Sequence, residues 1–112
     1  MKDLAALRVR YEKDSVEVQI GGLASNLSRM AWCMKRSDAA ADLSALCRES
    51  KYFAEWAANR ASLEMQGVLA EVQLEVALWE RMNARGRCSP EEAEQPKTWA
   101  QRLLRLSGLI AE

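Results

Sequence analysis

Residues 62–82 read SLEMQGVLAEVQLEVALWERM, and this stretch decides the fold. At about 100° per residue it predicts one helix with two apolar stripes on opposite sides. The first stripe consists of Met65, Val68, Leu69, Val72, Val76 and Trp79, and the second of Leu63, Gly67, Ala70, Leu74, Ala77 and Leu78. A helix with two apolar sides needs packing neighbours on both, so we expect it to lie within a helical bundle.

Two polar strips separate these stripes, and one of them is acidic. Glu64, Glu71 and Glu75 share that edge of the helix. Carboxylates in a row can hold Mg²⁺ or Mn²⁺, so the edge offers an alternative function, that of a Mg²⁺-dependent all-helical nucleotide phosphohydrolase. All-helical nucleotide pyrophosphatases carry a second acidic pair on the next helix, and that pair is not evident here. An acidic edge on a packed helix is more typical of a solvated rim.

The remaining chain predicts four further helices. Apolar residues at alternating steps of four and three predict a long helix after Asp14 or Ser15, with the stripe Val16, Ile20, Leu23, Leu27, Met30 and Met34. Ser37 and Asp38 are expected to cap a second long helix, which runs to about Ala58. Short helices are predicted at the two ends of the chain, from Leu4, Leu7 and Tyr11 and from Trp99, Leu103, Leu106 and Ile110.

Short connections make successive helices antiparallel neighbours. We therefore predict an all-α fold, an antiparallel bundle of three long helices with a short N-terminal and a C-terminal helix. The length of 112 residues fits a single domain that spans residues 1–112.

Glycines interrupt two of the predicted helices. Gly21 and Gly22 follow each other inside the first long helix, where each costs about 1 kcal/mol relative to alanine. A helix break is one explanation, but we favour the close approach of another helix backbone. For the same reason we expect the side of residues 62–82 that holds Gly67 and Ala70 to be the most closely packed.

The composition is that of an ordinary globular chain, with 49% hydrophobic and 29% charged residues. Its 16 basic and 16 acidic side chains give a formal net charge of +0, so no global field draws it to nucleic acid or to an anionic membrane. Arg81, Arg85 and Arg87 cluster near a predicted helix C-terminus, where cations offset the helix dipole, and we do not expect nucleic-acid binding there. No apolar run approaches the ~20 residues of a membrane helix and no secretory signal is evident, so we expect no membrane association and a cytoplasmic location.

The chain contains no histidine, which excludes histidine-based nucleophile systems and histidine acid–base chemistry. Its three cysteines are odd in number and form no Cys-x-x-Cys pair, so neither a disulfide framework nor a zinc site is expected. Cys33 and Cys47 fit buried helical positions, and Cys88 fits an exposed turn beside arginines. We expect no catalytic residue, no metal and no cofactor.

Apolar side chains recur on the reverse faces of the long helices. Trp32 lies opposite the core stripe of the first long helix, and Tyr52 and Trp56 lie opposite that of the second. With Leu74 and Leu78 they are more than a four-helix monomer can bury, and large aromatics are enriched at interfaces. We therefore predict a twofold homodimer whose interface includes these five residues. Tyr52 and Trp56 form the expected patch for recognition of self or of another protein.

Three segments together resemble one group of proteins, namely GGLASNLSR at 21–29, ESKYFAEW at 49–56 and LAEVQL at 69–74. They are similar to small helical proteins of cyanobacterial type with no assigned activity, over roughly the first three quarters of the chain. The resemblance brings no functional residues with it. The function we expect is that of a self-associating protein–protein interaction or regulatory helical module, with the phosphohydrolase as the alternative.

Overall fold

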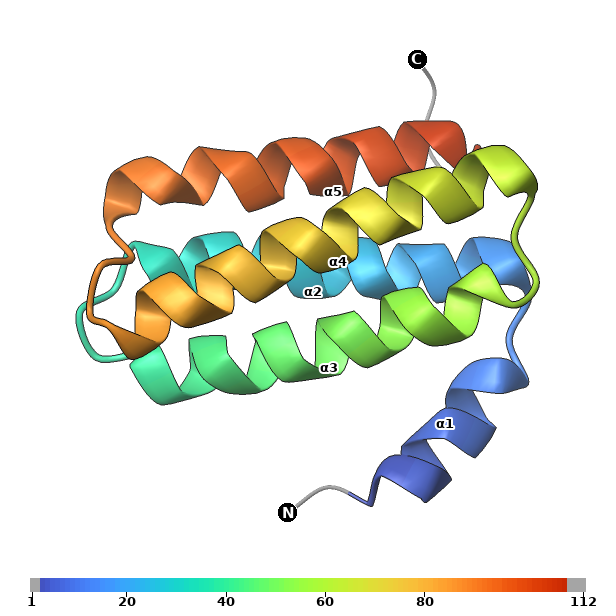
Figure 1. Cartoon of the computed structure of the whole chain (residues 1–112), viewed down its shortest axis with the longest axis horizontal. Coiled ribbons are helices and arrows are strands. Elements are labelled where there is room, and N and C mark those ends of the chain that lie inside the picture. Colours follow the sequence, from blue (N-terminus) through green and yellow to red (C-terminus); the bar gives the residue numbers. More distant parts are fainter. Residues whose placement is uncertain (1–2, 109–112) are drawn as a thin grey trace.

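The computed structural model describes residues 3–108, and within that range it is all-helical. It contains α1 (Leu4–Glu12), α2 (Val16–Met34), α3 (Ala40–Ala58), α4 (Leu63–Ala84), the 3₁₀ helix η1 (Pro90–Ala93) and α5 (Glu94–Leu106). Figure 1 shows α2, α3, α4 and α5 running in alternate directions as a bundle, with α1 beside α3 at one end. The predicted all-α class, with its three long helices, is confirmed.

A single continuous core joins the helices. α3 packs against both α2 and α4, and α5 packs against α2. In Figure 1, α4 lies in front of α2 and between α3 and α5. The fully buried members of the core include Leu23, Leu27, Met30, Leu43, Leu69, Val72, Val76, Trp79 and Leu103. The predicted core stripe of α2 and the first stripe of α4 supply most of them.

Only the first of the two apolar stripes of α4 is buried. The two sides of the helix that flank this stripe face the neighbouring helices α3 and α5. Gln73 Nε2 donates a hydrogen bond to the carbonyl of Lys51 at 2.9 Å, and Lys51 Nζ lies 2.6 Å from Glu80 Oε1, which places one polar strip against α3. Trp79 Nε1 donates to Gln95 Oε1 at 3.0 Å and so ties α4 to α5. The expectation that α4 is packed on both apolar sides is therefore wrong, and its second stripe faces outward.

Polar side chains and glycine mark the ends of the helices. Ser15 Oγ accepts a hydrogen bond from the backbone N–H of Val18 at 3.3 Å, and Ser62 Oγ accepts one from Met65 at 3.1 Å. Gly86 follows α4 with a φ of 67°, a conformation that glycine adopts without strain. Local sequence therefore specifies where α2 and α4 begin and where α4 ends.

The predicted cap of α3 at Ser37 and Asp38 is wrong. α3 begins at Ala40 with no side-chain hydrogen bond to its free N–H groups. Asp38 instead accepts two hydrogen bonds of 3.1 Å from the guanidinium of Arg36. A carboxylate that accepts a bidentate pair of hydrogen bonds from an arginine is not free to cap the helix, since charge-assisted pairs of this kind are strong.

The two glycine-containing helices are both regular. α2 runs without a break through Gly21 and Gly22, which rules out the helix interruption. A Cβ at Gly22 would lie 3.8 Å from Cε1 of Tyr11, an ordinary contact distance. At Gly67 nothing outside its chain neighbours and the nearby backbone of α4 lies within 4 Å of a Cβ position, so the expected close packing at the small residues of α4 is wrong.

α1 is fixed to the bundle by Tyr11 and by the turn that follows the helix. Tyr11 Oη donates to the carbonyl of Gln19 at 2.6 Å, and Gln19 Nε2 donates back to the carbonyl of Tyr11 at 3.0 Å. Burial raises the pKa of the Tyr11 hydroxyl, so the group remains a donor. Arg60 Nη1 donates to the carbonyls of Glu12 at 3.1 Å and Asp14 at 2.8 Å. The end of α1 is thereby tied to both α2 and the α3–α4 connection.

The C-terminal segment makes one turn as η1 and continues directly as α5. Pro96 lies in the first turn of α5, where a missing N–H has no helical partner to lose. Leu103 is fully buried, Trp99 is half-buried and Leu106 is exposed, while Ile110 lies outside the described residues. Within residues 3–108, no helix has both the length and the apolarity to cross a membrane.

Alanine substitutions at Gly22 and Gly86 should change stability in opposite directions. At Gly22 alanine fits without a clash and favours the helix by about 0.5–1 kcal/mol. At Gly86 it must adopt a positive φ, which costs roughly 1–2 kcal/mol. Urea unfolding followed by circular dichroism should show a higher midpoint for Gly22→Ala and a lower one for Gly86→Ala. A lower midpoint for Gly22→Ala would mean that α1 leaves no room for the methyl group.

Candidate functional site

The second stripe of α4 forms an apolar surface that is open to solvent. We call it the α4 face, and it consists of Leu63, Gly67, Ala70, Leu74, Ala77 and Leu78. Leu63 is 85% exposed, Leu74 is 65% exposed and Leu78 is 48% exposed. Aligned leucines exposed along one helix are typical of interaction surfaces. The predicted interface residues Leu74 and Leu78 lie together on this face, and Leu63 extends it.

Trp56, by contrast, is covered within the chain by α1. Its side chain is only 4% exposed, and its ring centroid lies 5.9 Å from that of Tyr11 and 5.5 Å from that of Tyr52. Arg8 of α1 places its guanidinium carbon 5.8 Å from the same ring, and Tyr11 stacks on Phe53 at 4.1 Å. The expectation of an exposed Tyr52–Trp56 patch is therefore wrong, because α1 and α3 enclose these rings in one aromatic cluster.

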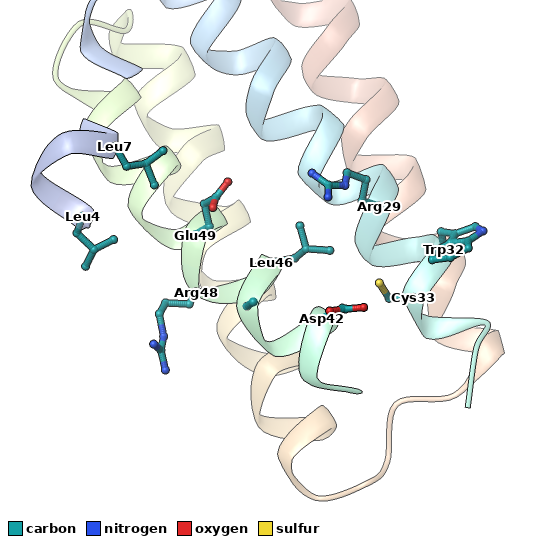
Figure 2. Close-up of a pocket in the computed structure, with 10 residues that line it drawn as sticks. Leu4, Leu7, Arg29, Trp32, Cys33, Asp42, Leu46, Arg48 and Glu49 are labelled. Carbon is teal, nitrogen blue, oxygen red and sulfur yellow. The ribbon is translucent and has the colours of Figure 1, made fainter. Parts of the chain in front are cut away.

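A groove of about 600 Å³ lies between α1, α2 and α3. Its lining comprises Leu4 and Leu7 of α1, Arg29, Trp32 and Cys33 of α2, and Asp42, Ala45, Leu46, Arg48 and Glu49 of α3. Figure 2 shows the α1 leucines at one end of the groove and Trp32 at the other. The groove exists because α1 has 9 residues while α2 and α3 have 19 each, so α1 covers only part of their joint surface.

Trp32 stands at the rim of this groove and is 56% exposed. The guanidinium carbon of Arg36 lies 4.4 Å from the centre of its ring, and Arg36 is held in turn by Asp38. The predicted exposure of Trp32 is confirmed. The residue belongs to the groove, however, and the structure does not bring it to the α4 face.

The groove is apolar inside and charged at its rim. Arg29 and Arg48 are matched by Asp42 and Glu49, so the rim carries no net charge. Glu49 Oε1 accepts a hydrogen bond from the buried Asn26 Nδ2 at 3.3 Å, which holds this carboxylate between α2 and α3. A hollow of this volume whose surface is mostly apolar suits an apolar side chain or a small apolar molecule.

The acidic edge of α4 faces α5. Glu71 Oε2 lies 3.9 Å from Arg102 Nη1, Glu75 lines a shallow hollow beside Trp99, and Glu64 is exposed in the first turn of α4. Within residues 3–108, no three His, Cys, Asp or Glu side chains are placed to hold a metal ion. The structure therefore does not bring the three predicted carboxylates together as a site.

Arg81, Arg85 and Arg87 are all exposed at the C-terminal end of α4 and in the turn after it. None of them forms an ion pair with another residue in the range 3–108. Arg81 follows Leu78 by three residues and so continues the line of the α4 face by one turn. The face consequently has a cation at one end and Glu64 at the other.

The three thiols are held protonated. Burial raises the pKa of Cys47 to about 12, and nearby Glu80 adds to the effect. Burial also raises the pKa of Cys33, and burial with Glu92 raises that of Cys88. Cys88 is half-buried, so the expected exposed turn is wrong at this position. A protonated thiol is a poor nucleophile, and these cysteines therefore act as packing residues at neutral pH.

The described residues define an all-α bundle of four antiparallel helices with a short N-terminal helix beside α3 at one end. No protein-family model, curated protein or solved structure matches the chain. The resemblance of residues 21–29, 49–56 and 69–74 to small helical proteins is therefore untested. Functional conclusions depend on the surfaces themselves.

Alanine substitutions should distinguish the buried tryptophan from the exposed one. Trp56→Ala removes a ring from the aromatic cluster and is expected to lower the free energy of unfolding by about 3–5 kcal/mol. Trp32→Ala removes a largely exposed ring with one stacking contact, and the expected loss is below about 1 kcal/mol. Chemical denaturation measures both. Equal losses would contradict the position of α1 over Trp56.

Stability should also fall in alkaline solution because of Cys47. The pKa of this thiol is higher in the folded chain than its ordinary value of 9.0, so the folded state binds the proton more tightly. The contribution to stability is complete below pH 9.0 and is lost as the pH rises toward about 12. Cys47→Ala should lose less stability than wild type across this interval, as measured by urea unfolding at a series of pH values. Parallel curves would refute this expectation.

Proposed function

We propose that this protein is a protein–protein interaction module that associates with a second copy of itself through the α4 face. The observation that carries the proposal is the row of Leu63, Leu74 and Leu78, exposed on a helix whose opposite side is core. Exposed leucines are not stabilised by contact with water. A second copy supplies an identical face, and contact between the two faces can bury the leucines of both.

The energetics favour a weak dimer. Burial of a large aliphatic side chain contributes roughly 1.5–3 kcal/mol, and each copy brings three leucines. Together they supply a driving force comparable with the about 4–15 kcal/mol that association costs. A dissociation constant in the micromolar range requires a net gain of about 8 kcal/mol, so it is reached when the cost of association lies near the lower end of that span.

The charges beside the α4 face do not oppose association. From Leu63 to Leu78 the face itself carries no charged side chain. Among the charges at its borders, Glu80 is paired with Lys51 and Glu71 lies next to Arg102. Contact along the leucine row therefore desolvates few charges, and Glu64 and Arg81, which form no ion pair with a described residue, lie at its two ends.

Leu74→Glu tests this proposal, because it places a charge in the middle of the α4 face at a position that is exposed in the single chain. The fold should be unaffected, since no buried contact is lost. Analytical ultracentrifugation should show wild type as a dimer at concentrations above the micromolar range and Leu74→Glu as a monomer.

Val18→Glu is the matched control. Val18 is also an exposed aliphatic residue on a long helix, but it belongs to α2 and lies outside the α4 face. This variant should dimerise like wild type. A wild-type protein that stays monomeric, or a Leu74→Glu variant that dimerises as well as Val18→Glu, would refute the proposal.

A further inference from the structure

We infer that the groove between α1, α2 and α3 is a binding site for a compact, uncharged apolar molecule. This inference goes beyond the proposed self-association and does not depend on it, because the lining of the groove comes from α1, α2 and α3 and not from α4. It is carried by the size of the groove, by the side chains at its two ends and by the balance of charges at its rim.

The groove has the size of a small-molecule site and is bounded at both ends. Its volume of about 600 Å³ lies within the ~300–1,000 Å³ that is typical of ligand pockets. Its lining on α3 runs from Asp42 to Glu49, which corresponds to about 10 Å along the helix. Leu4 and Leu7 lie at one end and Trp32 at the other, as Figure 2 shows. These limits favour a compact molecule over a segment of polypeptide, which would have to continue past both ends.

The inner surface of the groove is uncharged and mostly apolar. Leu7 and Leu46 are half-buried and belong to the edge of the core, and Cys33 is buried. Burial raises the pKa of the Cys33 thiol, so this group stays uncharged at neutral pH. An apolar molecule that enters the groove therefore leaves water for apolar contacts, which is the main source of favourable free energy in such sites.

The charges at the rim favour a ligand without charge. Arg29 and Arg48 supply two positive charges, and Asp42 and Glu49 supply two negative ones. The pKa of Cys33 is raised by burial, raised further by Asp42 and lowered by Arg29, so charges of both signs act on the same part of the groove. A charged ligand would lose hydration there without a net electrostatic gain. An uncharged molecule does not incur this cost.

A bound molecule should also hold α1 more firmly against the bundle. Tyr11 is the one buried side chain of α1, whereas Leu4 is 37% exposed and Leu7 is half-buried. A ligand that contacts both leucines adds an attachment at the end of α1 that lies away from Tyr11. Local opening of this helix should therefore become less frequent when the groove is occupied.

A matched pair of fluorescent probes tests the class of ligand. N-phenylnaphthylamine is uncharged, and anilinonaphthalenesulfonate has the same ring system with one negative charge. Fluorescence titration of wild type should give a dissociation constant at least about tenfold lower for the uncharged probe. Equal or tighter binding of the sulfonate would overturn the inference, and so would a lack of saturable binding of the uncharged probe.

Ala45→Phe tests the position of the site. Ala45 is exposed and lines the groove, so a phenyl group at this position occupies the hollow without the loss of a buried contact. The affinity for N-phenylnaphthylamine should fall by about tenfold. Ala41→Phe is the matched control, because Ala41 is also an exposed alanine of α3 and lies one turn away, outside the lining. This control should bind the probe like wild type, and equal affinities of the two variants would overturn the inference.

Two further variants separate the groove from the α4 face. Trp32→Ala removes the side chain at one end of the groove and should weaken binding of the uncharged probe about threefold. Leu74→Glu changes only the α4 face and should leave this binding unchanged. Loss of binding in Leu74→Glu, or full binding in Trp32→Ala, would overturn the inference.

Hydrogen exchange of wild type gives a readout that does not depend on a variant. The backbone amides of α1 should exchange more slowly with N-phenylnaphthylamine bound than without it. Unchanged exchange in α1 would overturn the assignment of the probe to this groove. A monomeric wild type that binds the probe would refute the proposed self-association and leave this inference intact.

Discussion

The burial of one side of α4 is the constraint on which the rest of the bundle depends. Val72 and Val76 are wholly buried, and Trp79 adds a hydrogen bond that ties α4 to Gln95 of α5. Because this side fills the core, the polar strips beside it must face α3 and α5. The remaining side has no neighbour left within the described chain, so the open α4 face follows from how the core is filled.

Helix positions could be predicted because they depend on local periodicity and capping. Ser62, for example, caps the N-terminus of α4 with its own hydroxyl group. Which stripe of α4 faces the core depends on distant partners, and the local pattern predicts that both stripes are buried. The signal was side-chain size, because Val72 and Trp79 remove more apolar area from water than Gly67 and Ala70 do.

The two tryptophans on the reverse faces of α2 and α3 show the limit of what the sequence can predict about the site. Trp32 and Trp56 each lie opposite the core stripe of their own helix, yet the first is exposed and the second is buried. The difference is α1, whose Tyr11 stacks over α3 and exchanges hydrogen bonds with Gln19. A 9-residue helix without one dominant apolar side could dock on several surfaces. Its position is a tertiary property that periodicity does not encode.

The groove and the α4 face are built from different helices, the groove from α1, α2 and α3. A contact made by α4 therefore leaves the groove accessible. In the proposed dimer, two such grooves would lie at a fixed distance and orientation, which would make the pair bivalent. A molecule with two apolar groups at a matching spacing would bind both grooves. Once the first group is bound, binding of the second is intramolecular, so the overall affinity would exceed that for one groove although neither contact is stronger.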